Sequence, residues 1–385
     1  MYCVAMKKND TAARALALHK KLRGKIRIVP TVPVRNRDDL SLVYTPGVAA
    51  VSMHVAKHPE SAREYTGKGK MVAVISDGSA VLGLGNIGAL GALPVMEGKC
   101  ALFKTFADVD AVPIVLDTQD PDEIIETVVR IAPAFGGINL EDIASPKCFE
   151  IERSIVKRLN IPVMHDDQHG TAVVVLAGLI NALKVVGKKM ESVRIVISGA
   201  GAAGTATAHL LHAAGARNIR VVDSVGIIGK HRHDLEPHKV ELAQFTNLAK
   251  EKGDLHAALF DADVLVGVSR AGIVDVSDVK HMAPGAIVFV LANPTPEILP
   301  VEARKGGAVV IGTGRSDFPN QINNSLAFPG IFRGALDHGV SKITQEMKLK
   351  AARAIAALVK KPTTENVVPD MFDKRVALAV ARVIR

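Results

Sequence analysis

The sequence predicts an α/β fold in two parts: an N-terminal α/β domain over residues 1–160, and a doubly wound parallel sheet with C-terminal helices over residues 161–385. Three observations predict it. At 385 residues the chain exceeds one ordinary hydrophobic core. Short, nearly continuous apolar runs rich in β-branched residues recur between helical patterns. A glycine-rich motif directly follows one of these runs.

In the N-terminal part, helical patterns alternate with a few buried strands. The sequence Tyr44-Thr-Pro-Gly47 interrupts a helical pattern, and Pro121 followed by acids is typical of a first helical turn. The strands expected here are 71–75 and 112–116, and the helices are 11–22, 39–56, 58–65, 86–106 and 121–131. A helix, a strand and another helix should follow up to residue 164, so the boundary lies near residues 150–168.

The C-terminal part has a more regular alternation. Each apolar run is short and nearly uninterrupted, as expected of strands that are covered on both faces. The strands expected are 193–198, 219–223, 264–268, 287–291 and 309–311. The helices expected are 170–186, 205–214, 241–252, 324–337 and 344–359. Together they predict an open parallel sheet.

Composition argues against a nucleic-acid partner despite a formal charge of +9. Aromatic residues make up 4% of the chain and Trp is absent, so stacking on bases is poorly supported. Basic residues are spread along the chain, with small clusters at 20–27 and 230–232, and suit an anionic substrate or cofactor equally well. We therefore expect a small-molecule ligand and no nucleic acid.

We also expect neither a membrane span nor a secretory signal. No stretch approaches the roughly 20 uninterrupted apolar residues that a membrane helix needs. At the N-terminus the apolar start precedes Lys7 and Lys8, which reverses the charge order of a secretory signal. Cys3, Cys100 and Cys148 are odd in number and lack zinc-pair spacing. Reduced thiols in a cytoplasmic protein are the interpretation.

The pattern Gly-x-Gly-x-x-Gly occurs twice, at Gly83–Gly88 and Gly199–Gly204. The second copy, Gly199-Ala-Gly201-Ala202-Ala203-Gly204, follows the strand at 193–198 and opens a helix, and a second strand ends at Asp223, 19 residues past Gly204. This context predicts a Rossmann-like site that places a dinucleotide pyrophosphate at a helix N-terminus. The first copy lacks that context, and we interpret it as a turn that lets backbone approach a substrate or nicotinamide.

The choice between NAD and NADP stays open at this point. Asp223 would favour NAD by binding the ribose 2′-hydroxyl. Ser224 beside it and the basic residues at 230–232 would suit a 2′-phosphate, although they also read as a solvated loop.

Two acidic pairs lie in apolar surroundings, Glu141-Asp142 and Asp166-Asp167. Adjacent carboxylates repel, so such pairs indicate a compensating cation. Hard cations such as Mg²⁺ or Mn²⁺ take oxygen ligands. The alternative for either pair is a helix cap or a solvated turn, especially for Asp166-Asp167 ahead of a helix.

Eight ordered blocks between about residues 25 and 340 resemble the malic enzyme family. The blocks are Tyr44-Thr-Pro-Gly-Val, Ile75-Ser-Asp-Gly-Ser-Ala-Val-Leu-Gly-Leu-Gly-Asn-Ile-Gly, Pro94-Val-Met-Glu-Gly-Lys99, Phe135-Gly-Gly-Ile-Asn-Leu-Glu-Asp142, His165-Asp-Asp-Gln-His-Gly-Thr-Ala, Gly199-Ala-Gly-Ala-Ala-Gly204, Asn293-Pro-Thr-Pro-Glu297 and Gly314-Arg-Ser-Asp-Phe-Pro-Asn-Gln-Ile-Asn-Asn324. The match is to the short prokaryotic type, which is similar to the malic enzyme part of bacterial hybrid malic enzymes.

The resemblance implies metal-dependent oxidative decarboxylation of (S)-malate to pyruvate and CO₂, with NAD or NADP as oxidant. It implies these roles: metal ligands Glu141, Asp142 and Asp167; general base Lys99; general acid Tyr44; Asp166 in the catalytic centre; substrate contacts Asn293, Asn323 and Asn324; and dinucleotide contacts Gly199, Gly201, Ala202, Ala203, Gly204, Asp223, Ser224 and Asn293. A homodimer or larger homo-oligomer is also implied.

Two features of the chemistry are predicted with the resemblance. Lys99 can act as a base only if its pKa falls well below ~10.4, which a nearby metal and partial burial would cause. Long eukaryotic members carry an Arg after the Asp-Gly turn where this chain has Ala80, so the distal malate carboxylate must be held by another group: Asn293, Asn324 or a basic residue elsewhere in the chain.

Two other functions compete with this one. A different two-domain dehydrogenase, acting on amino acids or a folate, would share the dinucleotide motif but need no metal. A binding or regulatory module would keep the fold without turnover. The four acids argue against the first, and the presence of Tyr44 and Lys99 argues against the second.

Overall fold

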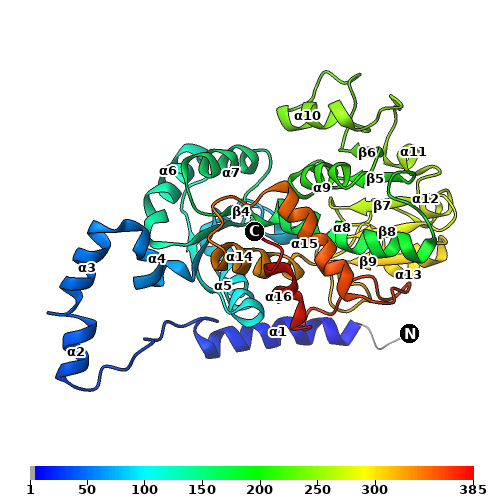
Figure 1. Ribbon diagram of the computed structural model, residues 1–385. Helices are drawn as coiled ribbons and strands as arrows, with labels where there is room; N and C mark the ends of the chain where they lie inside the picture. The colour runs from blue at the N-terminus through cyan, green and yellow to red at the C-terminus, as the bar shows by residue number, and fades with distance from the viewer. Residues whose placement is uncertain (1–4) are drawn as a thin grey trace.

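Two parallel β-sheets organise the chain in a computed structural model that describes residues 5–385 (Figure 1). The N-terminal sheet has four strands in the order β2-β1-β3-β4, and the C-terminal sheet has five in the order β6-β5-β7-β8-β9. Every pairing between named strands is parallel. The predicted α/β class with two parallel-sheet parts is thus confirmed.

The N-terminal sheet is built from short strands: β1 (Met71–Ser76), β2 (Asp110–Val115), β3 (Gly137–Leu140) and β4 (Val163–His165). Apart from the half-buried edge strand β2, these strands are almost entirely buried. The expected strands at 71–75 and 112–116 are present as β1 and β2. The helices around it are α5 (Gly88–Ala107), α6 (Pro121–Ile131) and α7 (Lys147–Arg158). Because all four strands are parallel, their carboxyl ends meet at one edge of the sheet.

All five strands expected in the C-terminal part are present: β5 (Arg194–Ser198), β6 (Asn218–Val222), β7 (Val264–Gly267), β8 (Ile287–Val290) and β9 (Val310–Thr313). The surrounding helices are α9 (Ala202–Ala213), α10 (Pro237–Phe245), α11 (Leu255–Leu259), α12 (Val276–Lys280) and α13 (Pro300–Lys305). The strand order reverses at β5, between β6 and β7, and ligands bind at the carboxyl edge of such a switch point.

Two expected helices need correction, and one helix was not expected. The helix expected over 241–252 is α10, which ends at Phe245 because Asn247 and Lys250 adopt positive φ. The helix expected over 324–337 divides into a 3₁₀ turn (Asn324–Leu326) and α14 (Phe328–Asp337). After α15 (Gln345–Leu358) comes a further helix that was not expected, α16 (Arg375–Ala381).

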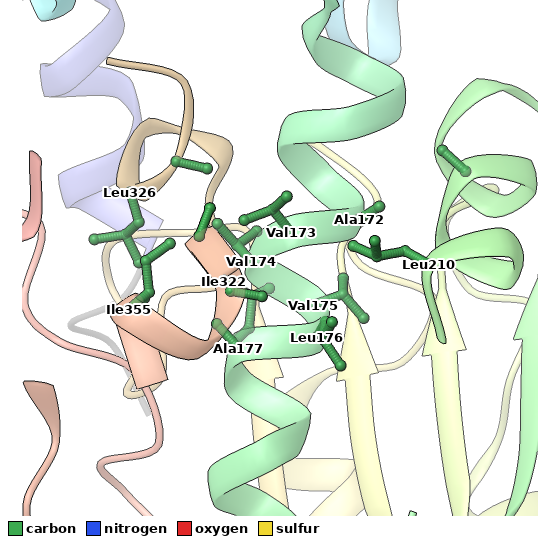
Figure 2. Packing of buried hydrophobic residues seen from close by; sticks show 14 of the residues in the cluster. Ala172, Val173, Val174, Val175, Leu176, Ala177, Leu210, Ile322, Leu326 and Ile355 are labelled. Carbon is green, nitrogen blue, oxygen red and sulfur yellow. The ribbon is translucent and has the colours of Figure 1, made fainter. Parts of the chain in front are cut away.

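The longest helix, α8 (Asp166–Val186), connects the two sheets and begins four residues before the expected start at residue 170. Figure 2 shows its side chains packed on two sides, with Ala172 near Leu210 of α9 and Val174 toward Ile322. By length and composition α8 is apolar enough to cross a membrane, but 67% of its most apolar window is buried inside the protein. Its position explains that apolarity as packing in the core.

An N-terminal arm runs along the lower side of the molecule and then extends away from both sheets (Figure 1). It comprises α1 (Ala5–Leu22), α2 (Arg37–Val43) and α3 (Val48–Lys57), and a short helix α4 (Ala62–Tyr65) leads back to β1. Neither α2 nor α3 has a buried residue. The arm nevertheless carries large apolar side chains in solvent, including Ile28 at 94% and Leu42 at 68% exposure.

Candidate active site

The acidic pairs converge at the carboxyl edge of the N-terminal sheet. Ligand atoms of Glu141, Asp142 and Asp167 all lie within 4.8 Å of one another. Glu141 and Asp142 follow β3, while Asp166 and Asp167 follow β4 and open α8. Since β3 and β4 are adjacent and parallel, two acidic pairs distant in sequence meet at one point.

The backbone around Asp142 tightens the cluster. Asp142 has φ 54°, in the left-handed region that aspartate adopts more readily than most residues. Its N–H donates to Asp167 Oδ2 at 2.7 Å, and Asn139 Nδ2 donates to Glu141 Oε2 at 2.8 Å. The carboxylates are therefore fixed by neighbours on β3 and in the loop that follows it.

Lys99 of α5 lies against these acids. Its Nζ is 2.7 Å from Glu141 Oε1 and 2.6 Å from Asp166 Oδ2. Lys99 is 8% exposed and Asp166 is fully buried. The ring of Phe328 lies beneath the ammonium, with its centroid 4.2 Å from Nζ, which adds a cation–π contact.

The pKa values of the cluster are shifted in the direction that crowded, buried acids require. Burial raises the pKa of Glu141 to about 7, and that of Asp166 to about 7. Burial also raises the pKa of Asp167 to about 6. Neutralising or sharing these charges relieves the crowding.

The pKa of Lys99 does not fall as expected in the chain without a bound cation. Burial by itself would lower the pKa, but the carboxylates of Asp166 and Glu141 more than offset that effect and raise it above the ordinary lysine value. Sequence reasoning gave weight to burial and a metal, and did not include two carboxylates in direct contact with the ammonium.

A cavity of about 820 Å³ opens beside this cluster, between the two sheets. Asn324 lines it and donates from Nδ2 to Asp166 Oδ2 at 2.6 Å. The other lining residues that the sequence singled out are Lys99, Glu141, Asp142, Asp167, Ala202, Ala203, Asn293 and Asn323. The structure therefore brings most of the expected site residues around one space.

Lys25 also lines this cavity, and sequence reasoning missed it. Its Nζ donates to the Pro94 carbonyl at 2.7 Å, and its N–H donates to Glu97 Oε2 at 3.0 Å, which joins it to α5. The only signal in the sequence was its membership of the basic cluster at 20–27. Its position 69 residues from Pro94 could not be read from that cluster.

The second glycine motif lies at the other side of the cavity. Gly201 is the N-cap of α9, and a Cβ added to it would meet nothing within 4 Å. Gly199 has φ 116°, and a Cβ on Gly204 would lie 1.8 Å from the Gly199 carbonyl oxygen. The loop packs tightly on itself and leaves open space at the amino end of the helix, where an anion binds favourably.

A second cavity, of about 600 Å³, lies behind the same loop. Gly199, Gly201, Asp223 and Ser224 line it. Ser145 and Ser269 line both this cavity and the one that contains Lys99, so the two cavities adjoin and an elongated ligand could occupy both.

Asp223 does not present a free carboxylate to this second cavity. Arg232 Nη1 donates to its Oδ1 at 2.6 Å, and Lys239 Nζ lies 3.2 Å from Oδ2. Although burial opposes the effect, hydrogen bonds from Arg232 and Val225 lower the pKa of Asp223. Asp223, which would favour the ribose of NAD, is therefore in contact with two basic side chains of the kind that would favour the 2′-phosphate of NADP.

Tyr44 is the expected site residue that one chain does not bring to the cavity. It is 66% exposed at the end of α2, on the arm, and is not among the described residues that line either cavity.

Comparisons with known proteins agree with this architecture. Residues 23–155 match the family model "Malic enzyme, N-terminal domain", and residues 168–384 match "Malic enzyme, NAD binding domain". The chain is 54% identical over 373 residues to the bifunctional malic/malolactic enzyme of Bacillus subtilis, covering 96% of this chain and 91% of that protein. It is 48% identical to the NADP-dependent malic enzyme of Halomonas elongata, covering 94% and 85%.

A solved structure gives the same result. The NAD-dependent malic enzyme of Thermotoga maritima superposes with a TM-score of 0.93 at 49% identity, covering 96% of this chain and 98% of that one. The two matched ranges include Lys99, Glu141 and Asp142 and all five strands of the C-terminal sheet, whereas β4, Asp166 and Asp167 lie in the short segment between them. By fold, by sequence and by the placement of these residues, the chain belongs to the malic enzyme family and is a nicotinamide-dependent oxidoreductase.

Proposed function

We propose that this chain oxidatively decarboxylates (S)-malate to pyruvate and CO₂ and reduces NAD or NADP with the aid of Mg²⁺ or Mn²⁺. The observation that carries the proposal is the set of three carboxylates within 4.8 Å of one another, next to Lys99 and in a cavity that reaches the amino end of α9. A dehydrogenase without a metal has no evident use for such crowded acids.

The residues present fit a hard cation. Glu141, Asp142 and Asp167 would supply carboxylate oxygens, the ligands such ions prefer. Oδ1 of the fully buried Asp166 has no hydrogen-bond partner among the described residues, so the centre is short of positive charge and donors. When bound, the cation would polarise the 2-oxygen of malate, stabilise the enolate left by CO₂, and offset the carboxylate charge that raises the pKa of Lys99.

Lys99 takes the proton from the malate hydroxyl in this proposal. Its Nζ lies 2.6 Å from Asp166 Oδ2, so the pair can share a proton within the buried centre. The pKa of about 7 for Asp166 suits such sharing near neutral pH. Asn324, which also donates to Asp166 Oδ2, holds that carboxylate in place.

Lys25 is proposed to hold the distal carboxylate of malate. The position that carries Arg in long relatives is Ala80 here, and Ala80 lines the same cavity as Lys25. Lys25 and Lys99 are the basic residues among those that line it, and Lys99 is already paired with two acids. Asn293 and Asn323, also on the cavity wall, would complete the substrate contacts.

The general acid is proposed to come from a second copy of the chain. Tyr44 lies on an extended arm whose helices α2 and α3 bury none of their residues in one chain. Apolar side chains exposed along that arm are typical of a surface that another subunit covers. We therefore infer a homodimer in which the arm of one copy brings Tyr44 to the other copy's cavity.

The proposal is tested by following the absorbance of reduced nicotinamide with L-malate, NAD or NADP, and Mn²⁺, before and after EDTA. We expect metal-dependent reduction with pyruvate, not oxaloacetate, as product. The Bacillus subtilis relative is named for malolactic activity as well, so lactate is measured in the same reactions. Folded, metal-loaded protein that reduces neither cofactor would contradict the proposal.

A further inference from the structure

A third cavity, of about 270 Å³, lies behind the proposed active site. Its walls come from α7, the first turns of α8, α9, α10 and the start of α15. None of the described residues that line it also lines the cavity containing Lys99. His238 also lines the second cavity, beside Asp223, so this space is separate from the Lys99 cavity and adjoins the dinucleotide side.

A polar chain of three residues crosses this cavity: Glu152 of α7, His169 of α8 and Lys348 of α15. Glu152 Oε2 lies 2.9 Å from His169 Nε2, and His169 Nδ1 lies 2.9 Å from Lys348 Nζ. Because a lysine ammonium can only donate, His169 accepts from it at Nδ1 and donates to Glu152 at Nε2. The three residues tie together helices that are far apart in sequence.

Lys348 is left with unused hydrogen-bonding capacity. Among the side chains that the structure describes, no carboxylate lies within 4.0 Å of its Nζ, and its hydrogen-bond partner is the neutral imidazole of His169. An ammonium has three donors, so two remain for an occupant of the cavity. Burial lowers the pKa of Lys348, with Glu152 partly opposing that effect, as expected for a cation that lacks a direct counter-charge.

The remaining walls define the shape of an occupant. Arg153 adds a second cation, and Glu241, the other acid on the wall, lies 3.8 Å from His209. Phe149, Ala172 and Leu210 make an apolar wall. A ligand with one anionic head and a short hydrocarbon body would satisfy both walls, whereas inorganic phosphate would leave the apolar wall in contact with water.

We propose that this cavity binds a small aliphatic carboxylate through Lys348, and that the ligand and the dinucleotide alter each other's affinity. Two contacts provide the coupling. Glu152 Oε1 accepts the N–H of His165 at 2.8 Å, immediately before Asp166 and Asp167. His238 packs on the Phe149 ring at a centroid distance of 4.6 Å and contacts the Ala200 carbonyl at 3.0 Å, within the glycine loop.

The test uses butyrate as the probe and the full chain with Mn²⁺ and saturating malate. By isothermal titration calorimetry we expect one butyrate site per chain, and a Kd at least tenfold weaker in Lys348→Gln. Lys350→Gln is the matched control, because Lys350 lies on the same helix, pairs with Glu346 and is absent from the cavity wall. Butyramide, which has the shape of butyrate without its charge, should not bind.

Coupling is measured as the Kd for NADH or NADPH, followed by the fluorescence of the reduced nicotinamide. Butyrate should change that Kd at least threefold in the unaltered protein and in Lys350→Gln, but not in Lys348→Gln, as reciprocity between two sites requires. These readouts are binding constants, so they can be measured and interpreted whether or not the protein turns over malate.

A second variant keeps the proposal testable if Lys348→Gln does not fold. Gln345 is exposed at the cavity mouth and the chain has no Trp, so Gln345→Trp introduces a single fluorescent reporter. Its emission should change over the same butyrate concentrations as the calorimetric signal. Butyrate binding that malate displaces, that Lys348→Gln leaves unchanged, or that leaves the dinucleotide Kd unaltered would overturn the proposal.

Discussion

The two glycine motifs share one pattern but have different surroundings. Gly199–Gly204 follows β5 directly and opens α9, whereas Gly83–Gly88 follows β1 after a further turn and passes through a 3₁₀ segment before α5. A Cβ on Gly204 would strike its own loop at the Gly199 oxygen, 1.8 Å away. A Cβ on Gly83 would strike the backbone oxygen of Asn293, in the loop after β8, 1.6 Å away.

This difference shows that the Gly-x-Gly-x-x-Gly pattern indicates only that other atoms come close to the backbone. The elements around each motif decide which atoms those are. The second loop folds on itself and leaves its helix N-terminus open to an anion. The first loop packs the N-terminal sheet against the Asn293 loop and leads into α5, the helix that carries Lys99. One motif is thus suited to a dinucleotide, and the other to joining the two sheets around the reacting groups.

The largest effect is expected for Lys99, on the helix that follows the first glycine loop. In Lys99→Gln we expect kcat to fall about 10³-fold, because a positioned base contributes roughly 10²–10⁴-fold. The dinucleotide Kd should change by less than about threefold, since Lys99 lies away from the second loop. Steady-state kinetics and fluorescence titration measure the two quantities. Lys104→Gln, an exposed lysine on the same helix, is the control, and a kcat within tenfold of the unaltered enzyme would exclude Lys99 as the base.

Alanine at one glycine of each loop tests the comparison directly. Gly201→Ala should weaken dinucleotide binding by about 10–100-fold with little change in melting temperature, because the added methyl meets no protein atom within 4 Å but fills the space for pyrophosphate. Gly83→Ala should instead lower the stability by a few kcal/mol through its backbone clash. Weakened dinucleotide binding in a fully stable Gly83→Ala protein would contradict the distinction between the loops.

A third substitution tests whether Lys25 binds the distal carboxylate of malate. Lys25→Gln should raise KM for malate by about tenfold or more while kcat stays within about threefold, because a charge-assisted hydrogen bond contributes roughly 1.5–3 kcal/mol. Lys21→Gln, exposed on α1, is the matched control. An unchanged KM would move the distal carboxylate to another group.

The smallest effect is expected for the preference between NAD and NADP, which Asp223 influences. Asp223→Ser should raise the ratio of NADP to NAD efficiency by about tenfold, because it removes a carboxylate whose repulsion of a 2′-phosphate is worth roughly 1–4 kcal/mol. Arg232 and Lys239, then released from Asp223, remain to attract the phosphate. Asp234→Ser is the control, since Asp234 also pairs with Arg232 but does not line the cavity. A lower ratio would show that Asp223 helps to hold these bases for NADP.

Much of the fold followed from local patterns. The runs that became β1, β2 and β5 to β9 are continuously apolar enough to be recognised without knowledge of their partners. By contrast, β3 contains Gly137 and Asn139 and β4 has only three residues, and both become strands because β1 and each other supply their partners. The end of α10 at Phe245 was missed because positive φ at Asn247 depends on contacts outside the segment.

The residues of the candidate site were also recognisable, but their interactions were not. Sequence by itself determined the class of fold, the glycine loop after β5 and the identity of the acids and Lys99, since each depends on residue type and near neighbours. Only the tertiary structure decided that Lys99 contacts two carboxylates that raise its pKa, that Lys25 reaches the cavity, and that Tyr44 does not. These facts depend on distances between segments far apart in the chain, and no local pattern encodes such distances.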